Sequence, residues 1–177
     1  MERFGIGISK FYKVSFEQFK KDFTEKFYTP VKLSDEEIRE IWDDIKLPKR
    51  ATTGSAGYDF FMPAKCIIAK GESVVIPTGI RCCMDNGWVL KEYPRSGHGF
   101  KTGIHLANTV GIIDSDYFYA DNEGHIMIKL VNDSSLANLI KLEKGSAFCQ
   151  GIFIPFGITI DDDTTDKRHG GFGSTSK

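Results

Sequence analysis

The chain has 177 residues, 41% of them hydrophobic, a length that suits one sizeable core and is short for two independent domains. Its formal net charge is −1, from 23 basic and 24 acidic residues, which excludes the basic surface that holds nucleic acid through its phosphates. The apolar stretches are short and no apolar leader opens the chain, so we expect a cytoplasmic protein that does not bind membranes. Free nucleotides remain open as ligands.

The first fifty residues show the periodicity of two amphipathic helices. Ser15 with Gln18 predicts a capping box for the first helix, and Ser34 with Glu37 predicts one for the second, which ends before Pro48. Because aromatic helix faces are ordinarily buried, we expect residues 1–50 to form a helical extension packed on the rest of the chain. The apolar faces are Phe16, Phe19, Phe23 and Phe27 in the first helix and Ile38, Ile41, Trp42 and Ile45 in the second.

Residues 51–160 are rich in short β-type runs separated by glycine, proline and asparagine, a texture typical of a sandwich or barrel. No amphipathic run long enough for a crossover helix lies between these runs, which argues against parallel βαβ units. We therefore predict an all-β domain of antiparallel or mixed, jelly-roll-like strands. The candidate strands are 58–62, 66–69, 73–77, 79–84, 88–93, 125–132 and 147–156.

The spacing of the four cysteines matches neither a Cys-x-x-Cys metal site nor a dense disulfide framework. We expect reduced, apolar core side chains. A nucleophilic thiol would need a base beside it, and no segment around these residues supplies one. The four are Cys66, Cys82, Cys83 and Cys149.

Residues 161–177 are polar and glycine-rich and cannot bury enough surface to fold alone, which predicts a flexible C-terminal tail. Phe172, set among Gly170, Gly171 and Gly173, is unusual for a tail that only solvates the chain. Such a segment could instead wrap a phosphate with backbone N–H groups and offer an aromatic face to a base.

Two short segments carry candidate chemistry. Ser96 stands between Arg95 and Gly97 without the Gly-x-Ser-x-Gly elbow of a nucleophile, so contact with phosphate suits it better. Asp114 and Asp116 share a face if their segment is extended, although either one alone would more often be a turn residue.

Five segments, in order, resemble the five motifs of the trimeric all-β dUTPase family. They are AGYDFF at 56–61, PRSG at 94–97, GIIDSDY at 111–117, KGSAFCQGIF at 144–153 and GGFGST at 170–175, with PTGI at 77–80 also in place. The resemblance implies a distorted jelly roll or β-barrel and a homotrimer whose active sites are shared between chains. It also implies hydrolysis of dUTP to dUMP and pyrophosphate, which keeps uracil out of DNA and supplies dUMP for thymidylate synthesis.

The resemblance further implies roles for single residues. Asp114 would deprotonate the water that attacks the α-phosphorus, a task that a positioned carboxylate can perform. Mg²⁺ would be the cofactor, bound by the three phosphates and by waters, and Asp59 would meet those waters. Arg95 would brace either Asp114 or the phosphate environment. The residues implied in binding substrate are Arg95, Ser96, Gly97, Asn108, Tyr117, Ile126, Gln150, Lys167, Arg168, Phe172, Gly173, Ser174 and Thr175.

The substrate residues divide by the part of dUTP that they would contact. Ser96 and Gln150 would contact the phosphates, and Tyr117 would pack beneath the deoxyribose, leaving no room for a ribose 2′-hydroxyl. Asn108 and the residues around 124–126 would read uracil. Phe172 would stack on the base while the tail closes as a lid with Ser174 and Thr175 on the γ-phosphate.

The chain departs from the family pattern in two places. Lys167 holds the position where family tails usually carry an arginine, and Arg168 lies one residue closer to the glycines, so either could meet the γ-phosphate. Residues 118–125 lengthen the segment after Tyr117, either as a surface insertion or as an element for gating or partner binding.

Two rival functions stay open beside dUTP hydrolysis. A related dCTP deaminase would need a catalytic glutamate on the strand 125–132, near the position where Lys129 stands instead. A regulatory protein could also use the same fold to bind a protein partner, with or without catalysis.

Overall fold

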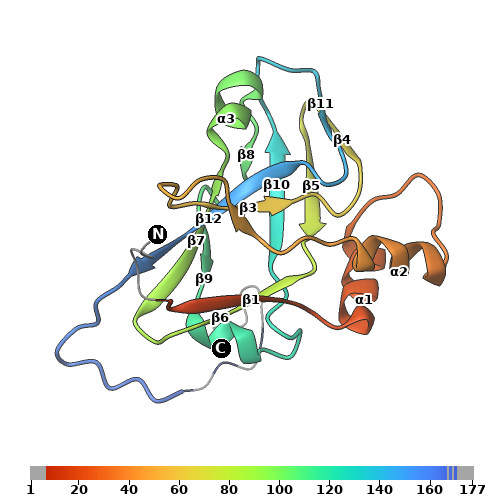
Figure 1. Cartoon of the computed structure of the whole chain (residues 1–177). Helices are drawn as coiled ribbons and strands as arrows, with labels where there is room; N and C mark the ends of the chain where they lie inside the picture. The colour runs from red at the N-terminus through yellow and green to blue at the C-terminus, as the bar shows by residue number, and fades with distance from the viewer. Residues whose placement is uncertain (1–6, 167, 169, 171–177) are drawn as a thin grey trace.

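The computed structural model describes residues 7–166, 168 and 170, and within them short strands dominate (Figure 1). The first half of the chain contains β1 (Ser9–Lys13), α1 (Phe16–Lys26), α2 (Asp35–Asp43), β2 (Lys49–Arg50), β3 (Tyr58–Phe61), β4 (Cys66–Ala69), β5 (Glu72–Pro77) and β6 (Ile80–Met84). The second half contains β7 (Trp88–Pro94), α3 (Ser96–Thr102), β8 (His105–Leu106), β9 (Gly111–Ile113), the 3-10 helix η1 (Ser115–Tyr119), β10 (Met127–Asn132), β11 (Leu139–Leu142) and β12 (Ala147–Pro155).

The largest sheet has five strands in the order β2-β3-β12-β7-β9, and a second sheet has the order β5-β10-β8. The remaining strands form the pairs β1-β6 and β11-β4. All these pairings are antiparallel, so the predicted all-β class is confirmed. The expectation of a barrel is not met, because the sheets of the described residues do not join into one closed ring.

The N-terminal region contains a strand that the helical periodicity did not predict. β1 pairs with β6 over the register from Ser9 opposite Met84 to Lys13 opposite Ile80. Phe11 is the buried residue at its centre, and its ring packs among other aromatic rings of the largest sheet. The first fifty residues are therefore joined to the β-rich part by backbone hydrogen bonds as well as by helix packing.

The two helices begin as predicted, with one difference. Ser34 and Glu37 form a complete capping box at α2. At α1 the Ser15 hydroxyl accepts a hydrogen bond from the Gln18 backbone, but the Ser15 backbone N–H is bound by the Glu123 carboxylate, not by the Gln18 side chain. The capping box predicted from Ser15 and Gln18 is thus correct for the first hydrogen bond and wrong for the second, because Glu123 from a distant segment accepts from the Ser15 backbone.

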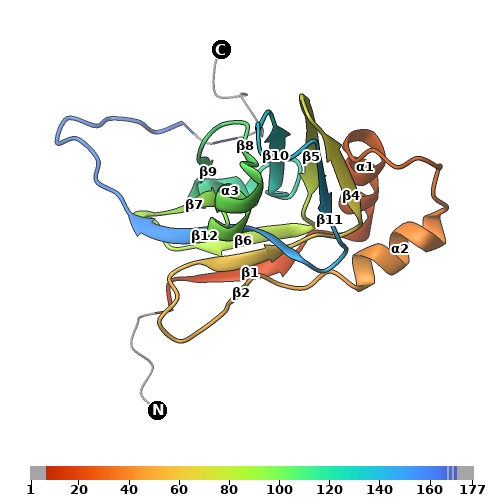
Figure 2. The same cartoon turned by 90° about the horizontal axis from the view of Figure 1, so that it is seen from above.

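Both helices lie at one end of the molecule, on the side of β5 (Figures 1 and 2). Their apolar faces join the same hydrophobic core as the strands, as the periodicity predicts. Among the described residues, no helix is long and apolar enough to cross a membrane. The buried apolar residues of the two helices and of the positions just after them are Phe19, Phe23, Phe27, Ile38 and Ile45, with Phe16, Ile41 and Trp42 packed against them.

The four cysteines are free thiols, and Cys66, Cys82 and Cys149 are buried in the core. Burial raises the pKa of Cys66 to about 11 and holds the pKa of Cys149 well above its usual range. Thiols that stay protonated are poor nucleophiles, and the prediction of apolar core cysteines is confirmed for these three, whereas Cys83 is only partly buried.

Glu92 on β7 is a buried acid in this core. Its Oε2 accepts a hydrogen bond from the Cys149 thiol at 3.3 Å, while Oε1 has no hydrogen-bond partner in the described part of the chain. Burial raises the pKa of Glu92 to about 8. The folded state therefore holds the proton more tightly than the unfolded state, and this group destabilises the fold progressively as pH rises from its ordinary pKa of 4.5 to about 8.

We predict that Glu92→Gln, which removes the charge and keeps the shape, flattens the loss of stability across that pH range. In the wild type, the contribution of Glu92 to the free energy of unfolding changes by about 1.4 kcal/mol per pH unit in the steepest part of this range. Thermal unfolding of both proteins at a series of pH values measures the difference. Equal pH slopes for the variant and the wild type would contradict this assignment.

Candidate functional site

The central strands of the largest sheet bring three of the predicted motifs together. Gln150 on β12 lies opposite Asp59 on β3 and opposite Tyr93 on β7. Arg95 follows β7 directly, and its Nε lies 3.0 Å from Asp59 Oδ1. The Gln150 side-chain amide donates to the Pro94 carbonyl at 3.1 Å. The cation, the carboxylate and the amide are therefore held in fixed relation by strand pairing.

A pocket of about 510 Å³ opens beside these residues. Ser96 and Gly97 are exposed at the beginning of α3, next to the Arg95 guanidinium. Phe100, whose exposed fraction is 88%, was not singled out from the sequence, although a large aromatic residue in a short glycine-rich segment is a usable signal. The pocket is lined by Tyr93, Pro94, Arg95, Ser96, Gly99, Phe100 and Gln150.

Close packing maintains one wall of this polar cluster. A Cβ atom on Gly57, just before β3, would lie 2.4 Å from the Gln150 Oε1 atom. Any other residue at this position would push the amide away from the pocket, so the glycine in the AGYDFF segment has a steric reason.

A second cluster surrounds η1. Arg168 Nη2 lies 2.5 Å from Asp114 Oδ2, and Arg168 Nε lies 2.8 Å from Asp116 Oδ1. The guanidinium carbon is 5.8 Å from the centroid of the Tyr117 ring. One guanidinium thus binds two carboxylates and lies over an aromatic face. Asp114 is the extended residue that caps η1 after β9, whereas Asp116 lies within the 3-10 helix itself.

The two clusters lie far apart within one chain. Ile113 pairs with Leu90, so Asp114 comes opposite Val89, whereas Arg95 follows the far end of β7. Six residues of strand span about 20 Å. In Figure 1, α3 is accordingly at the top of the molecule and η1 is at the bottom, near the label C.

Within one chain, Arg95 therefore does not brace Asp114. Arg95 is bound to Asp59, and the cation beside Asp114 is Arg168. The alternative role for Arg95, in the phosphate environment, agrees with its place at the pocket. The two roles could not be separated from the sequence because strand register decides them.

The remaining predicted residues lie in different surroundings. Asn108 is exposed in the turn between β8 and β9. Tyr117 is buried, and its hydroxyl donates to the His125 carbonyl at 2.9 Å. Ile126 is fully buried, and both of its backbone groups are already bonded within the chain, to Ile80 and to Thr78. Lys167, Phe172, Gly173, Ser174 and Thr175 lie outside the described residues.

The donor set suits a metal held indirectly. The described residues contain no group of three or more histidine, cysteine, aspartate or glutamate side chains that could hold a metal ion. Asp59 pairs with Arg95 through Oδ1, which leaves its second oxygen, Oδ2, as a further acceptor. Such an oxygen can accept a hydrogen bond from a water on a cation, so the residues fit Mg²⁺ bound mainly by its ligand and by waters.

Comparison with known proteins places these motifs in a family. The model of the dUTPase family matches residues 43–176. The chain belongs to the dUTPase family. The "Deoxyuridine 5'-triphosphate nucleotidohydrolase" of Lactococcus lactis subsp. lactis (strain IL1403) is 42% identical over 134 residues, which are 74% of this chain and 88% of the relative. The protein of the same name from Tolumonas auensis is 37% identical over 145 residues, covering 77% and 91%.

Solved dUTPase structures share the fold. The dUTPase from Streptococcus mutans superposes with a TM-score of 0.59 at 40% identity, over 66% of this chain and 89% of that chain. A mutant dUTPase from phage phi11 of S. aureus, described with a structural Mg(II) ion, superposes with a TM-score of 0.56 at 19% identity, over 68% and 90%. The dUTPase family match begins at the last residue of α2, so β1 and α1 lie outside it.

Proposed function

We propose that the protein hydrolyses dUTP to dUMP and pyrophosphate in the cytoplasm, by attack of water on the α-phosphorus. The observation that carries this proposal is the pocket lined by Arg95, Ser96 and Gln150, with Arg95 paired to Asp59, in segments within the dUTPase-family match. A guanidinium, a hydroxyl and an amide in a fixed frame suit a polyphosphate, because phosphoryl transfer needs placement and charge neutralisation more than covalent help.

The phosphate chain binds at this pocket. The Arg95 guanidinium supplies positive charge, and the exposed Ser96 hydroxyl donates to a phosphate oxygen. Gln150 lies at the same wall and contacts the phosphate chain. Asp59 holds Arg95 in place and accepts from a metal-bound water through its second oxygen. Mg²⁺, when bound, neutralises the charge that develops on the phosphates.

Asp114 is the proposed general base. Its side chain has an exposed fraction of 47%, and its position directly after β9 fixes the direction of the carboxylate. A carboxylate here can orient a water and take its proton as the oxygen attacks phosphorus. Arg168 occupies one of its oxygens, so we propose that the guanidinium transfers to the phosphates when substrate arrives.

The same transfer opens the sugar site. Arg168 lies over the ring of Tyr117, and its departure would expose that face for the deoxyribose. A ring packed beneath the sugar leaves no room for a 2′-hydroxyl, which excludes UTP by steric contact. Asn108, exposed in its turn, remains the proposed contact for uracil.

The substrate is tested by measuring pyrophosphate release from dUTP, dCTP, dTTP and UTP under the same conditions. We expect release from dUTP alone at a substantial rate. Release of ammonia from dCTP would favour the deaminase. If no pyrophosphate is released and the protein binds a protein partner instead, the hypothesis of a regulatory protein is favoured.

The distance between the two clusters supports a shared site. Asp114 of one chain cannot reach a phosphorus bound at Ser96 of the same chain across about 20 Å. We therefore propose a homotrimer in which neighbouring chains complete each site, a closed cyclic assembly with equivalent sites.

Mixing two inactive variants tests the shared site. Ser96→Ala and Asp114→Asn chains, unfolded together and refolded at equal ratio, should recover roughly a quarter of wild-type activity, because some sites draw both intact residues from different chains. Each variant refolded alone is the control. Light scattering should give the mass of three chains, and no recovery on mixing would place both residues in one chain's site.

A further inference from the structure

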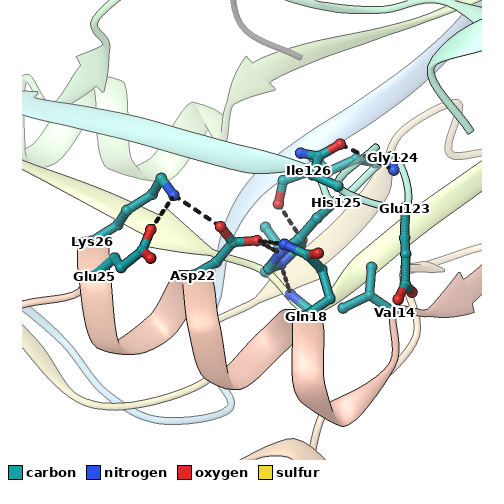
Figure 3. A network of polar contacts seen from close by, with 12 residues as sticks. Val14, Gln18, Asp22, Glu25, Lys26, Glu123, Gly124, His125 and Ile126 are labelled. Carbon is teal, nitrogen blue, oxygen red and sulfur yellow. Dashed lines mark hydrogen bonds and ion pairs between the residues drawn. The ribbon is translucent and has the colours of Figure 1, made fainter. Parts of the chain in front are cut away.

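Helix α1 is attached to the segment after Tyr117 by a buried polar contact (Figure 3). Asp22 on α1 and His125 are both buried, and Asp22 Oδ2 lies 2.6 Å from His125 Nδ1. Asp22 also accepts hydrogen bonds from Gln18 at 2.7 Å and Lys26 at 2.8 Å. Burial opposes ionisation, but these bonds hold the pKa of Asp22 well below its usual range, so the buried group is a carboxylate.

The protonation of the His125 ring follows from its neighbours. The backbone N–H of Gly79 donates to His125 Nε2 at 2.8 Å, so this nitrogen is an acceptor. The proton is therefore on Nδ1, which donates to Asp22. The imidazole is thus held between α1 on one side and the turn between β5 and β6 on the other.

The backbone of the same histidine holds the phenol of Tyr117. The Tyr117 hydroxyl donates to the His125 carbonyl at 2.9 Å and accepts from the Asn122 side-chain amide at 2.9 Å. Gly124 N in turn donates to Asn122 Oδ1 at 3.2 Å. The position of the phenol is therefore set by residues 122–125, and the position of these residues depends on the contact between His125 and Asp22.

A second contact fastens the same segment to the beginning of α1. Glu123 accepts from the Ser15 backbone at 2.8 Å and from the Ser15 hydroxyl at 2.6 Å, through its two carboxylate oxygens. Arg81 donates to the Phe118 carbonyl at 2.5 Å and lies over the Phe118 ring, 3.7 Å from its centroid. Residues 118–125 are thus held at several points, two of them on α1.

We propose that Asp22 is a positioning residue for nucleotide choice: through His125 it fixes the Tyr117 ring against the deoxyribose site and so sets the discrimination of dUTP from UTP. This rests on the proposed function of Tyr117. The part of the chain that supplies Asp22 and Ser15 precedes the dUTPase-family match at residue 43. The lengthened segment 118–125 therefore has a structural partner in the N-terminal region, and the two act as one brace behind the sugar site.

The test compares two substitutions of Asp22. Asp22→Leu leaves the His125 Nδ1–H buried without an acceptor, and the imidazole must move to reach one. We expect the ratio of kcat/KM for dUTP to that for UTP to fall by at least about tenfold, within the range that a pocket contact controls. Asp22→Asn keeps a side-chain oxygen for the same N–H and should restore most of the ratio.

Ile38→Ala is the matched control, because it removes a buried apolar side chain from α2 that supplies none of the hydrogen bonds of His125. It should lower the melting temperature and leave the ratio of kcat/KM for dUTP to that for UTP unchanged. If Asp22 had only a structural role, the kcat/KM ratio of dUTP to UTP would instead follow the loss of stability in every variant, Ile38→Ala included.

A second measurement reads the position of Tyr117 without catalysis. In protein labelled with fluorotyrosine, Tyr117→Phe identifies the Tyr117 resonance in the fluorine NMR spectrum. Asp22→Leu should shift or broaden this resonance, and Ile38→Ala should not. If the wild type releases no pyrophosphate from dUTP, the proposed function fails, while the resonance still tests the positioning.

Two outcomes would overturn the proposal. An unmoved Tyr117 resonance in Asp22→Leu would show that the helix does not position the phenol. A moved resonance with an unchanged dUTP to UTP ratio would show that this position does not set nucleotide choice.

Discussion

Replacing Asp114 by asparagine is expected to reduce turnover of dUTP by at least about 10²-fold, the lower range for loss of a positioned general base. The amide keeps the shape of the carboxylate but cannot accept the proton of the attacking water. Binding of a non-hydrolysable dUTP analogue should persist, because the substitution leaves the proposed phosphate contacts of Arg95, Ser96 and Gln150 intact.

Asp116→Asn is the matched control for this prediction. Both aspartates bind the same Arg168 guanidinium, and their side chains are similarly exposed, at 47% for Asp114 and 54% for Asp116. If loss of the ion pair were the cause, both variants would lose activity alike. We expect single-turnover cleavage of dUTP to be much slower in Asp114→Asn than in Asp116→Asn. Near wild-type turnover in Asp114→Asn would show that another residue is the general base.

Removal of the tail after Ile160 is expected to leave a folded assembly with turnover reduced by at least about 10²-fold, since misplacement of reacting groups has effects of this size. Residues 161–166 are exposed, so the core is not disturbed by the cut. The truncation removes Arg168, the cation that we propose to transfer from Asp114 to the phosphates, together with Phe172 and the hydroxyls proposed to close over the substrate.

Arg168→Ala in the full-length chain separates the cation from the rest of the tail. It should reduce turnover less than the truncation does, because Phe172 and the other tail residues remain. The second readout is protease cleavage of the tail, which should slow when a non-hydrolysable dUTP analogue is added. Full activity of the truncated protein, or protease cleavage of the tail that the analogue does not slow, would show that the tail does not act as a lid.

The elements with strong local signals could be predicted from the sequence. The capping box of Ser34 and Glu37 lies within four neighbouring positions, and the helix predicted from it is confirmed as α2. Strands such as β7 and β12 are rich in β-branched and aromatic residues, and they were also predicted. In these places local preference and the final structure agree.

Elements that depend on distant partners were missed. β1 is five residues long, and Phe11 is its one buried residue, so its pattern is too short to stand out from the helical pattern that follows it. α3 contains Gly97 and Gly99, which disfavour a helix on propensity alone. Glu123 binds Ser15 across 108 positions of the chain, and no local pattern announces such a pair.

The candidate site was predicted in content but not in arrangement. The five segments identified Asp59, Ser96 and Asp114 by residue type and order. That Asp114 lies about 20 Å from Arg95 in one chain depends on the register of β7 against β9, which the order of motifs does not contain. The buried Asp22 could have been noticed, since an aspartate within the phenylalanine stripe of α1 requires a polar partner.

The most direct test of the proposed reaction is hydrolysis of dUTP in heavy-oxygen water, with the products analysed by mass spectrometry. Attack on the α-phosphorus by a water that Asp114 deprotonates forms the new oxygen bond on the phosphate of dUMP. This mechanism places the heavy oxygen in dUMP and none in the pyrophosphate. Label in the pyrophosphate, or no cleavage at all, would contradict it.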